Sequence, residues 1–247
     1  MKRLTVTGVG AWSAILMFPI LIAGGVMLSA SGASDLLPPT GKSGRDWLVA
    51  VASDGAFAAG GWLLILMGYL AAVAFVGFYY ELRHAGQVLI LAPVLGVAGM
   101  VLVQISHLIP IGMAYQLAPA YVARGADQAT LGVVSDTFAA TAVNVNAAGD
   151  ALVWGVTVPM FAWAVLATRA LPRWIGWLGF VVAAFAGWLG LFAPASNVIE
   201  GISNIGFPAF FIFMLSMGIA LLRRQHREGQ NQAASVDDLT PAPSETV

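Results

Sequence analysis

The sequence predicts an all-α fold, a polytopic transmembrane bundle of six spans with both termini in the cytoplasm. The first observation is the composition, because 59% of the 247 residues are hydrophobic and only 9% are charged. The mean hydropathy is +0.84. One soluble domain cannot bury so much apolar surface, so the lipid bilayer is the expected solvent. The other two observations are the unbroken apolar runs and the uneven distribution of basic residues between the loops.

Six apolar runs are long enough to cross a bilayer, which takes about 20 mostly apolar residues. They cover residues 9–29, 56–79, 88–109, 149–168, 174–193 and 205–222. Together they predict one domain, residues 1–224, followed by a polar cytoplasmic tail, residues 225–247, that is expected to be disordered. The first run also resembles a signal peptide, but its apolar core exceeds the usual length of about 7–15 residues, which favours an uncleaved helix.

Basic residues near the span ends predict the orientation. With the N-terminus inside, eight of them are cytoplasmic: Lys2, Arg3, Arg83, Arg169, Arg173, Arg223, Arg224 and Arg227. Only Lys42, Arg45 and Arg124 are then outside. A seventh span at residues 129–146 would reverse this bias and place Asp136 unpaired in lipid. We therefore predict that residues 129–143 form an amphipathic helix that lies on the outer surface.

The small number of lysines and histidines, and their positions, exclude several kinds of site. The two lysines, Lys2 and Lys42, lie outside the spans, so no retinal Schiff base can form in the bundle. His107 is the one histidine near a span interior, which argues against haem and against a histidine-rich zinc site. We expect no cofactor and no metal. The net charge of −1 indicates no nucleic-acid partner, which leaves membrane lipids and a lipophilic small molecule as the expected partners.

Span 4 carries the first group of candidate site residues. Asn146, Asp150 and Thr157 fall on one helical face, so a polar stripe is expected to run from the outer surface into the membrane. Trp154 is expected to line the same cavity. Two interpretations of Asp150 stay open: a functional carboxylate, or a residue of the first helical turn that only stabilises the helix terminus.

Span 3 and the loop before span 6 carry the second group. Met100, Gln104 and His107 share a face of span 3. If His107 approached Asp150, the pair could perform acid/base chemistry, although an isolated imidazole also fits a hydrogen-bonded residue at the interface. Glu200 and Asn204 could roof the same pocket, or be ordinary loop residues. The candidate catalytic residues are therefore Asp150, His107 and Glu200, and the candidate pocket residues are Asn146, Trp154, Thr157, Gln104, Met100 and Asn204.

Residues 149–190 carry a packing signal and a family resemblance. Gly179, Ala183 and Gly187 recur every four residues, which predicts a seam where helix backbones approach closely. The run "GDALVWGVTVPMFAWAVLATRALPRWIGWLGFVVAAFAGWLG" resembles an uncharacterised bacterial family of six-helix membrane proteins, a domain of unknown function. This resemblance implies the six-span layout and a bacterial cytoplasmic membrane, and it implies no activity.

Three classes of function fit these observations. The favoured class is a membrane protein with a polar-lined pocket facing the outer leaflet that binds or moves a lipophilic small molecule or lipid. The second is an intramembrane acid/base enzyme, such as a cyclase or isomerase, acting on an isoprenoid or lipid. The third is a membrane subunit without chemistry of its own.

Overall fold

The computed structural model describes residues 5–33, 36–52, 55–195, 202 and 205–237, and within these ranges it is all helical, with no strand. Six helical units are long and apolar enough to cross a membrane: Val6–Ala30, Gly55–Ala85, Gln87–Val122, Gln128–Thr168, Arg173–Phe192 and Gly206–Glu228. The predicted six spans are confirmed. The protein is an integral, multi-pass membrane protein.

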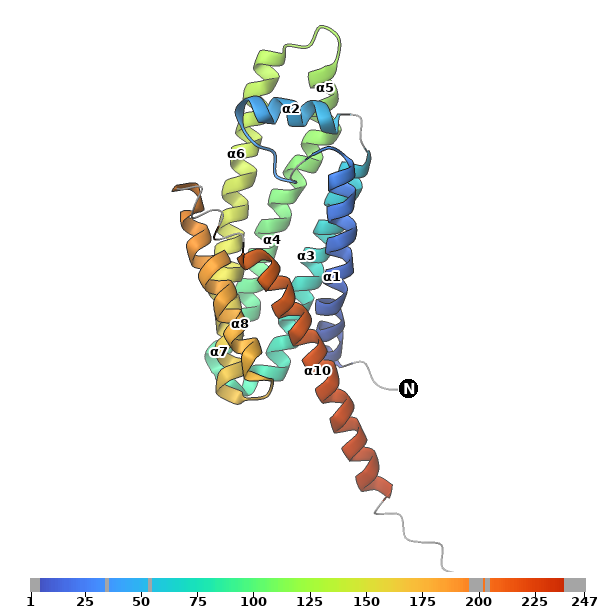
Figure 1. The fold of residues 1–247 in the computed structure, drawn as a ribbon, viewed down its shortest axis with the longest axis vertical. Helices are drawn as coiled ribbons and strands as arrows, with labels where there is room; N and C mark the ends of the chain where they lie inside the picture. The colour runs from blue at the N-terminus through green and yellow to red at the C-terminus, as the bar shows by residue number, and fades with distance from the viewer. Residues whose placement is uncertain (1–4, 34–35, 53–54, 196–201, 203–204, 238–247) are drawn as a thin grey trace, which may run out of the picture.

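The helices follow one another as an up-and-down bundle (Figure 1). The first half comprises α1 (Val6–Ala30), α2 (Gly41–Val51), α3 (Gly55–Leu82), the short 3₁₀ turns η1 (Arg83–Ala85) and η2 (Gln87–Ile90), α4 (Leu91–Gly112), the π-helical η3 (Met113–Leu117) and α5 (Ala118–Val122). The second half comprises α6 (Gln128–Leu152), the π-helical η4 (Val153–Thr157), α7 (Val158–Thr168), α8 (Arg173–Val182), the π-helical η5 (Ala183–Leu189), η6 (Gly190–Ala195) and α10 (Gly206–Asp237).

The bundle has two distinct ends in Figure 1. We call the end that holds the start of α1, the η1–η2 turn and the α7–α8 loop the basic end, because Arg83, Arg169 and Arg173 lie there. The opposite end, which α2 crosses, is the α2 end. The charge bias described above predicts that the basic end faces the cytoplasm.

Two helical units are much longer than a bilayer requires. The units Gln87–Val122 and Gln128–Thr168 contain 36 and 41 residues. At about 1.5 Å per residue they extend roughly 54 and 62 Å, against a hydrocarbon core of about 30 Å. Their excess length forms a hairpin at the α2 end (Figure 1). The prediction of a separate surface helix at residues 129–143 is therefore corrected, because this segment is helical but forms the first half of α6.

The start of α6 is fixed by a capping residue that the sequence analysis did not identify. The Asp127 carboxylate accepts hydrogen bonds from the backbone N–H of Thr130 at 3.1 Å and from the Thr130 hydroxyl at 2.7 Å. These two bonds lower the pKa of Asp127. Because the helix begins here, Asp150 lies deep inside a continuous helical unit, and its interpretation as a first-turn residue is wrong.

The hairpin and α2 share a small core of their own. The Asp136 carboxylate accepts a hydrogen bond from the backbone N–H of Gly41 at 2.7 Å, and so caps α2 from a distant part of the chain. Trp47 of α2 is buried and packs edge-on against Phe57, with ring centroids 5.1 Å apart. The remaining members of this core come from the end of α1, the α1–α2 loop, α2, η3 and α5, chiefly Leu28, Leu36, Leu48, Met113, Ala118 and Tyr121.

Glycines set the spacing of the main helix pairs. A Cβ atom built on Gly149 of α6 would lie 2.7 Å from the carbonyl oxygen of Gly99 on α4. A Cβ built on Gly187 of η5 would lie 2.7 Å from Cα of Gly155 in η4, and one on Gly179 would lie 2.7 Å from Cβ of Ala162. At the two glycine–glycine contacts no side chain separates the backbones, so these helices pack at unusually short range. The predicted packing seam of span 5 is confirmed at Gly179 and Gly187.

An ion-pair cluster holds the basic end together. Arg224 of α10 lies 2.9 Å from the Glu81 carboxylate at the end of α3 and 2.9 Å from Glu228, one turn along its own helix. It also donates to the carbonyl of Ala170 in the α7–α8 loop at 3.5 Å. The helix α10, which contains the Arg224–Glu228 pair, continues to Asp237, so residues 225–237 of the tail expected to be disordered are helical.

We predict that Gly149→Ala lowers the free energy of unfolding by about 1–3 kcal/mol, because the added methyl group must push α4 and α6 apart. Gly112→Ala is the matched control, since a Cβ there meets no atom within 4 Å. Alanine is the better helix former, so this control should gain up to about 1 kcal/mol. Unfolding in detergent measures both variants, and equal stabilities would contradict the glycine contact.

Candidate functional site

Polar side chains gather on the neighbouring stretches of α4 and α6. A Cβ atom on Gly149 would lie 2.9 Å from the backbone nitrogen of Val103, and the Ser106 hydroxyl lies 3.0 Å from the Asn146 side chain. Residues 103–107 of α4 therefore run beside residues 146–150 of α6. We call their polar members the polar layer: Gln104, Ser106, His107, Asn146 and Asp150.

The polar layer lies within the membrane-spanning part of the bundle. Gln104 is 15 residues along from Leu89, which is roughly 22 Å at about 1.5 Å per residue, and so within a hydrocarbon core of about 30 Å. Ionisable side chains are rare at such a depth, since a charge there costs several kcal/mol unless a partner offsets it. The layer is accordingly the first candidate for a functional site.

One half of the polar layer is a chain of hydrogen bonds. The Ser106 hydroxyl donates to Asn146 Oδ1 at 3.0 Å, and the Val103 carbonyl at 2.7 Å is a second acceptor for the same proton. Asn146 Nδ2 donates to Asp150 Oδ2 at 2.6 Å, one helical turn along α6. The Asn146 amide is thus oriented from both sides, and it presents its N–H to the carboxylate.

The other half of the polar layer makes no hydrogen bond to the described residues. Gln104 is only 4% exposed, yet neither its Nε2 nor its Oε1 has a partner among them. Its amide lies directly on Gly68 of α3, where any Cβ atom would overlap it. Nδ1 of His107 is likewise buried and unpaired. Each such group costs about 1–3 kcal/mol of lost hydration unless a water, an ion or a ligand pairs with it.

The hypothesised contact between His107 and Asp150 is not formed. Both residues belong to the polar layer, but among the described residues no hydrogen bond or ion pair joins them, and Asp150 is bonded to Asn146 instead. A general base must lie within hydrogen-bond reach of the proton that it takes. Catalytic roles for Asp150 and His107 therefore stay predictions without a supporting contact.

The other predicted site residues lie outside the polar layer or outside the described residues. Met100 is buried one turn from Gln104, beside the layer. Thr157 lies nearer the basic end, where its hydroxyl donates to the Ala92 carbonyl at 3.2 Å. The Trp154 ring packs against Phe207 and Phe210 of α10 and not on the layer. Glu200 and Asn204 lie outside the described residues. No group of three or more potential metal ligands occurs within the described ranges.

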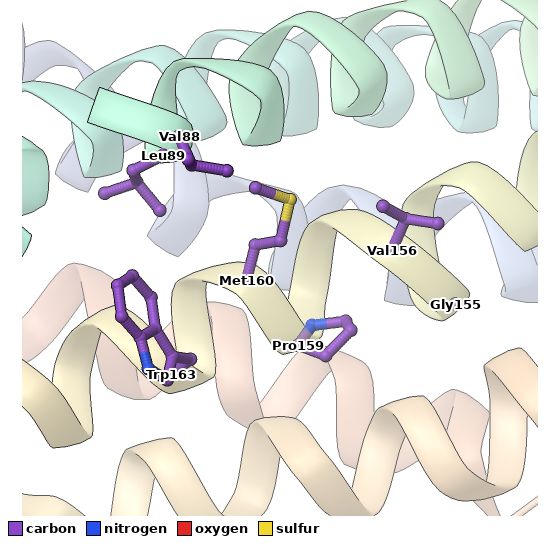
Figure 2. A pocket seen from close by; sticks show the side chains of 7 residues that line it. All are labelled: Val88, Leu89, Gly155, Val156, Pro159, Met160 and Trp163. Carbon is purple, nitrogen blue, oxygen red and sulfur yellow. The ribbon is translucent and has the colours of Figure 1, made fainter. Parts of the chain in front are cut away.

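A groove of about 540 Å³ lies between η2 and the η4–α7 segment (Figure 2). It is lined by Val88, Leu89, Gly155, Val156, Pro159, Met160 and Trp163. In Figure 2 the Met160 side chain reaches from α7 toward Val88 of η2. The lining is apolar, and the groove lies in the half of the bundle nearer the basic end. It therefore differs in chemistry and in place from the polar-lined outer pocket that we expected.

A proline shapes the helix beside this groove. Pro159 has no N–H, so the Gly155 carbonyl one turn earlier cannot receive the usual helical bond. The Trp188 indole N–H of η5 donates to that carbonyl instead, at 3.1 Å. The turn that contains Gly155 is π-helical, as is common where a proline disturbs the hydrogen-bond ladder. The Trp188 bond and the Gly155–Gly187 contact together fix η4 against η5.

Comparison with known protein families, with curated proteins and with solved structures finds no match for this chain. The six spans that the family resemblance implies are present, but no family model matches, so membership of the uncharacterised bacterial family stays a prediction. Any functional conclusion must rest on the site itself.

We predict that Asn146→Ala lowers the free energy of unfolding by about 1–3 kcal/mol, because it leaves Asp150 unpaired inside the membrane. Ser106→Ala should cost less, about 0.5–1.5 kcal/mol, since it removes only the outer member of the chain. Asn144→Ala on an exposed position of the same helix is the control, with a change within about 0.5 kcal/mol. Detergent unfolding curves in which Asn146→Ala matches Asn144→Ala would show that the hydrogen-bond chain contributes nothing.

Proposed function

We propose that this protein binds or moves a lipophilic small molecule or lipid, and that the polar layer receives the polar group of that molecule. The observation that carries the proposal is the Gln104 amide, which is buried inside the membrane without a hydrogen-bond partner among the described residues. A side chain of this kind lowers stability unless a partner pairs with it, and a polar group of a bound lipophilic molecule would supply that partner.

The chemistry of the polar layer limits what the ligand can be. Gln104 offers one donating and one accepting group, His107 offers a ring nitrogen of either kind, and Asp150 accepts. A neutral group that both donates and accepts hydrogen bonds, such as a hydroxyl or an amide, matches the hydrogen-bonding groups of all three side chains. Buried Met100 and Met67 are apolar and adaptable, and they suit an isoprenoid or acyl body better than a polar one. The ligand class is therefore a lipophilic alcohol or amide.

The location of the polar layer favours access from one side of the membrane. The layer lies toward the α2 end, where the hairpin and α2 form a separate core above the spans. The excess of arginines at the opposite end supports a cytoplasmic basic end, and so an outer-leaflet position for the layer. On this basis we propose that both termini lie inside, and with the resemblance to a bacterial family we propose the cytoplasmic membrane of a bacterium as the location.

The test is to purify the full-length protein from host membranes and to identify the bound lipophilic molecules by mass spectrometry. We expect a molecule that copurifies with the wild type and that Gln104→Leu depletes about tenfold, the loss expected from one or two hydrogen bonds. After delipidation the same variant should unfold at a higher temperature than the wild type, because an unpaired buried amide has been removed.

Thr157→Val is the matched control, because Thr157 is a fully buried polar residue that is already hydrogen bonded to Ala92. We expect this variant to lose stability and to keep the bound molecule. The proposal fails if Gln104→Leu and Thr157→Val retain the same molecules in the same amounts, or if Gln104→Leu destabilises the delipidated protein.

A further inference from the structure

The apolar groove is a separate feature from the polar layer. Its residues on η4 and α7 run from Gly155 to Trp163, beyond Asp150 in the direction of the basic end. Val88 and Leu89 of η2 close its other side (Figure 2). With a volume of about 540 Å³, it is within the range of small-molecule sites, and its apolar lining suits a hydrocarbon chain.

The mouth of the groove lies beside the η1–η2 turn. Trp163 is 47% exposed, and its ring lies 3.8 Å from the position of a Cβ atom on Gly86, the residue between η1 and η2. Tryptophan at the end of a span prefers the level of the lipid headgroups, because its ring is apolar and its N–H is polar. The groove therefore leads from the hydrocarbon region to the headgroup region at the basic end.

Three arginines stand at this end of the bundle. Arg83 belongs to η1 itself and lies over the Tyr80 ring, 5.8 Å from its centroid. Arg169 ends α7 in the left-handed conformation, with φ of 54°, and Arg173 begins α8. All three are exposed, and in the part of the chain that the structure describes none of them forms an ion pair.

The acidic residues that the structure describes near these arginines are already engaged. Glu81 and Glu228 both pair with Arg224. The positive charge of Arg83, Arg169 and Arg173 is thus left for a partner outside the chain. The planar guanidinium group of arginine forms bidentate hydrogen bonds to phosphate oxygens. Basic pockets between helices are suited to anionic lipid headgroups.

We propose that the groove holds an acyl chain of an anionic phospholipid, and that Arg83 and Arg169 bind the phosphate of its headgroup. The groove supplies apolar contact along the chain, Trp163 lies at the boundary between chain and headgroup, and the arginines select for negative charge. This site does not depend on the proposed function of the polar layer, because the two share no residue.

The test compares binding of phosphatidylglycerol and phosphatidylcholine to the full-length protein in detergent, by native mass spectrometry. We expect the wild type to retain phosphatidylglycerol preferentially. An arginine near the membrane surface contributes about fivefold in affinity for an anionic lipid, so the double variant Arg83→Gln, Arg169→Asn should lose about 25-fold of the preference. Asparagine is chosen at residue 169 because it tolerates the left-handed conformation.

Two further variants test the groove and the specificity of the charge effect. Val156→Trp fills the groove from an exposed position and should weaken retention of both lipids, and Met160→Phe is a milder change with the same expected direction. Arg124→Gln, at the α2 end, removes an exposed arginine far from the groove and should change nothing. Equal retention of the two lipids by the wild type, or a preference that the double variant keeps, would overturn the proposal.

Discussion

The contact between Gly99 and Gly149 is the constraint on which the rest of the site depends. Because neither residue has a side chain, the backbones of α4 and α6 approach until a Cβ atom on either would lie within 2.8 Å of the other helix. This short separation lets the Ser106 hydroxyl reach Asn146 across the pair. It also sets the register in which residues 103–106 of α4 run beside residues 146–149 of α6. A wider spacing would separate the Ser106 hydroxyl from Asn146.

The same helix pair links the membrane-spanning bundle to the structure above it. The helical units that contain α4 and α6 continue past the ends of α1 and α3 and form the hairpin on which α2 rests. Asp136 fixes α2 there through its hydrogen bond with Gly41. At the other end, Arg224 ties α3, the α7–α8 loop and α10 together. The polar layer therefore lies between two regions that are each held by charged or capping contacts.

The spans and their packing seam could be predicted from the sequence, because length, hydropathy and glycine spacing are local properties. Helical periodicity also predicted that Asn146 and Asp150 share one face of span 4, and that Gln104 and His107 share one face of span 3. Thr157 lies on the side of its helix that faces α4, as the polar stripe predicts, and it packs there against Gly96 and the Ala92 carbonyl. The position of Trp154 could not be predicted, because its contacts with α10 depend on how distant helices pack. Ser106 gave no signal, since a serine in an apolar helix commonly bonds only to its own backbone. The extent of α6 was missed because its low hydropathy resembled a surface helix, and its start depends on the single capping residue Asp127.

A bound molecule at Gln104 is tested most directly by an experimental map of the protein in lipid nanodiscs that resolves the surroundings of this side chain. We expect non-protein density within hydrogen-bonding distance of its amide, about 2.7–3.2 Å, continuous with an elongated apolar feature beside Met100. A map in which the Gln104 amide is bonded to protein groups alone, with no such density, would contradict this expectation.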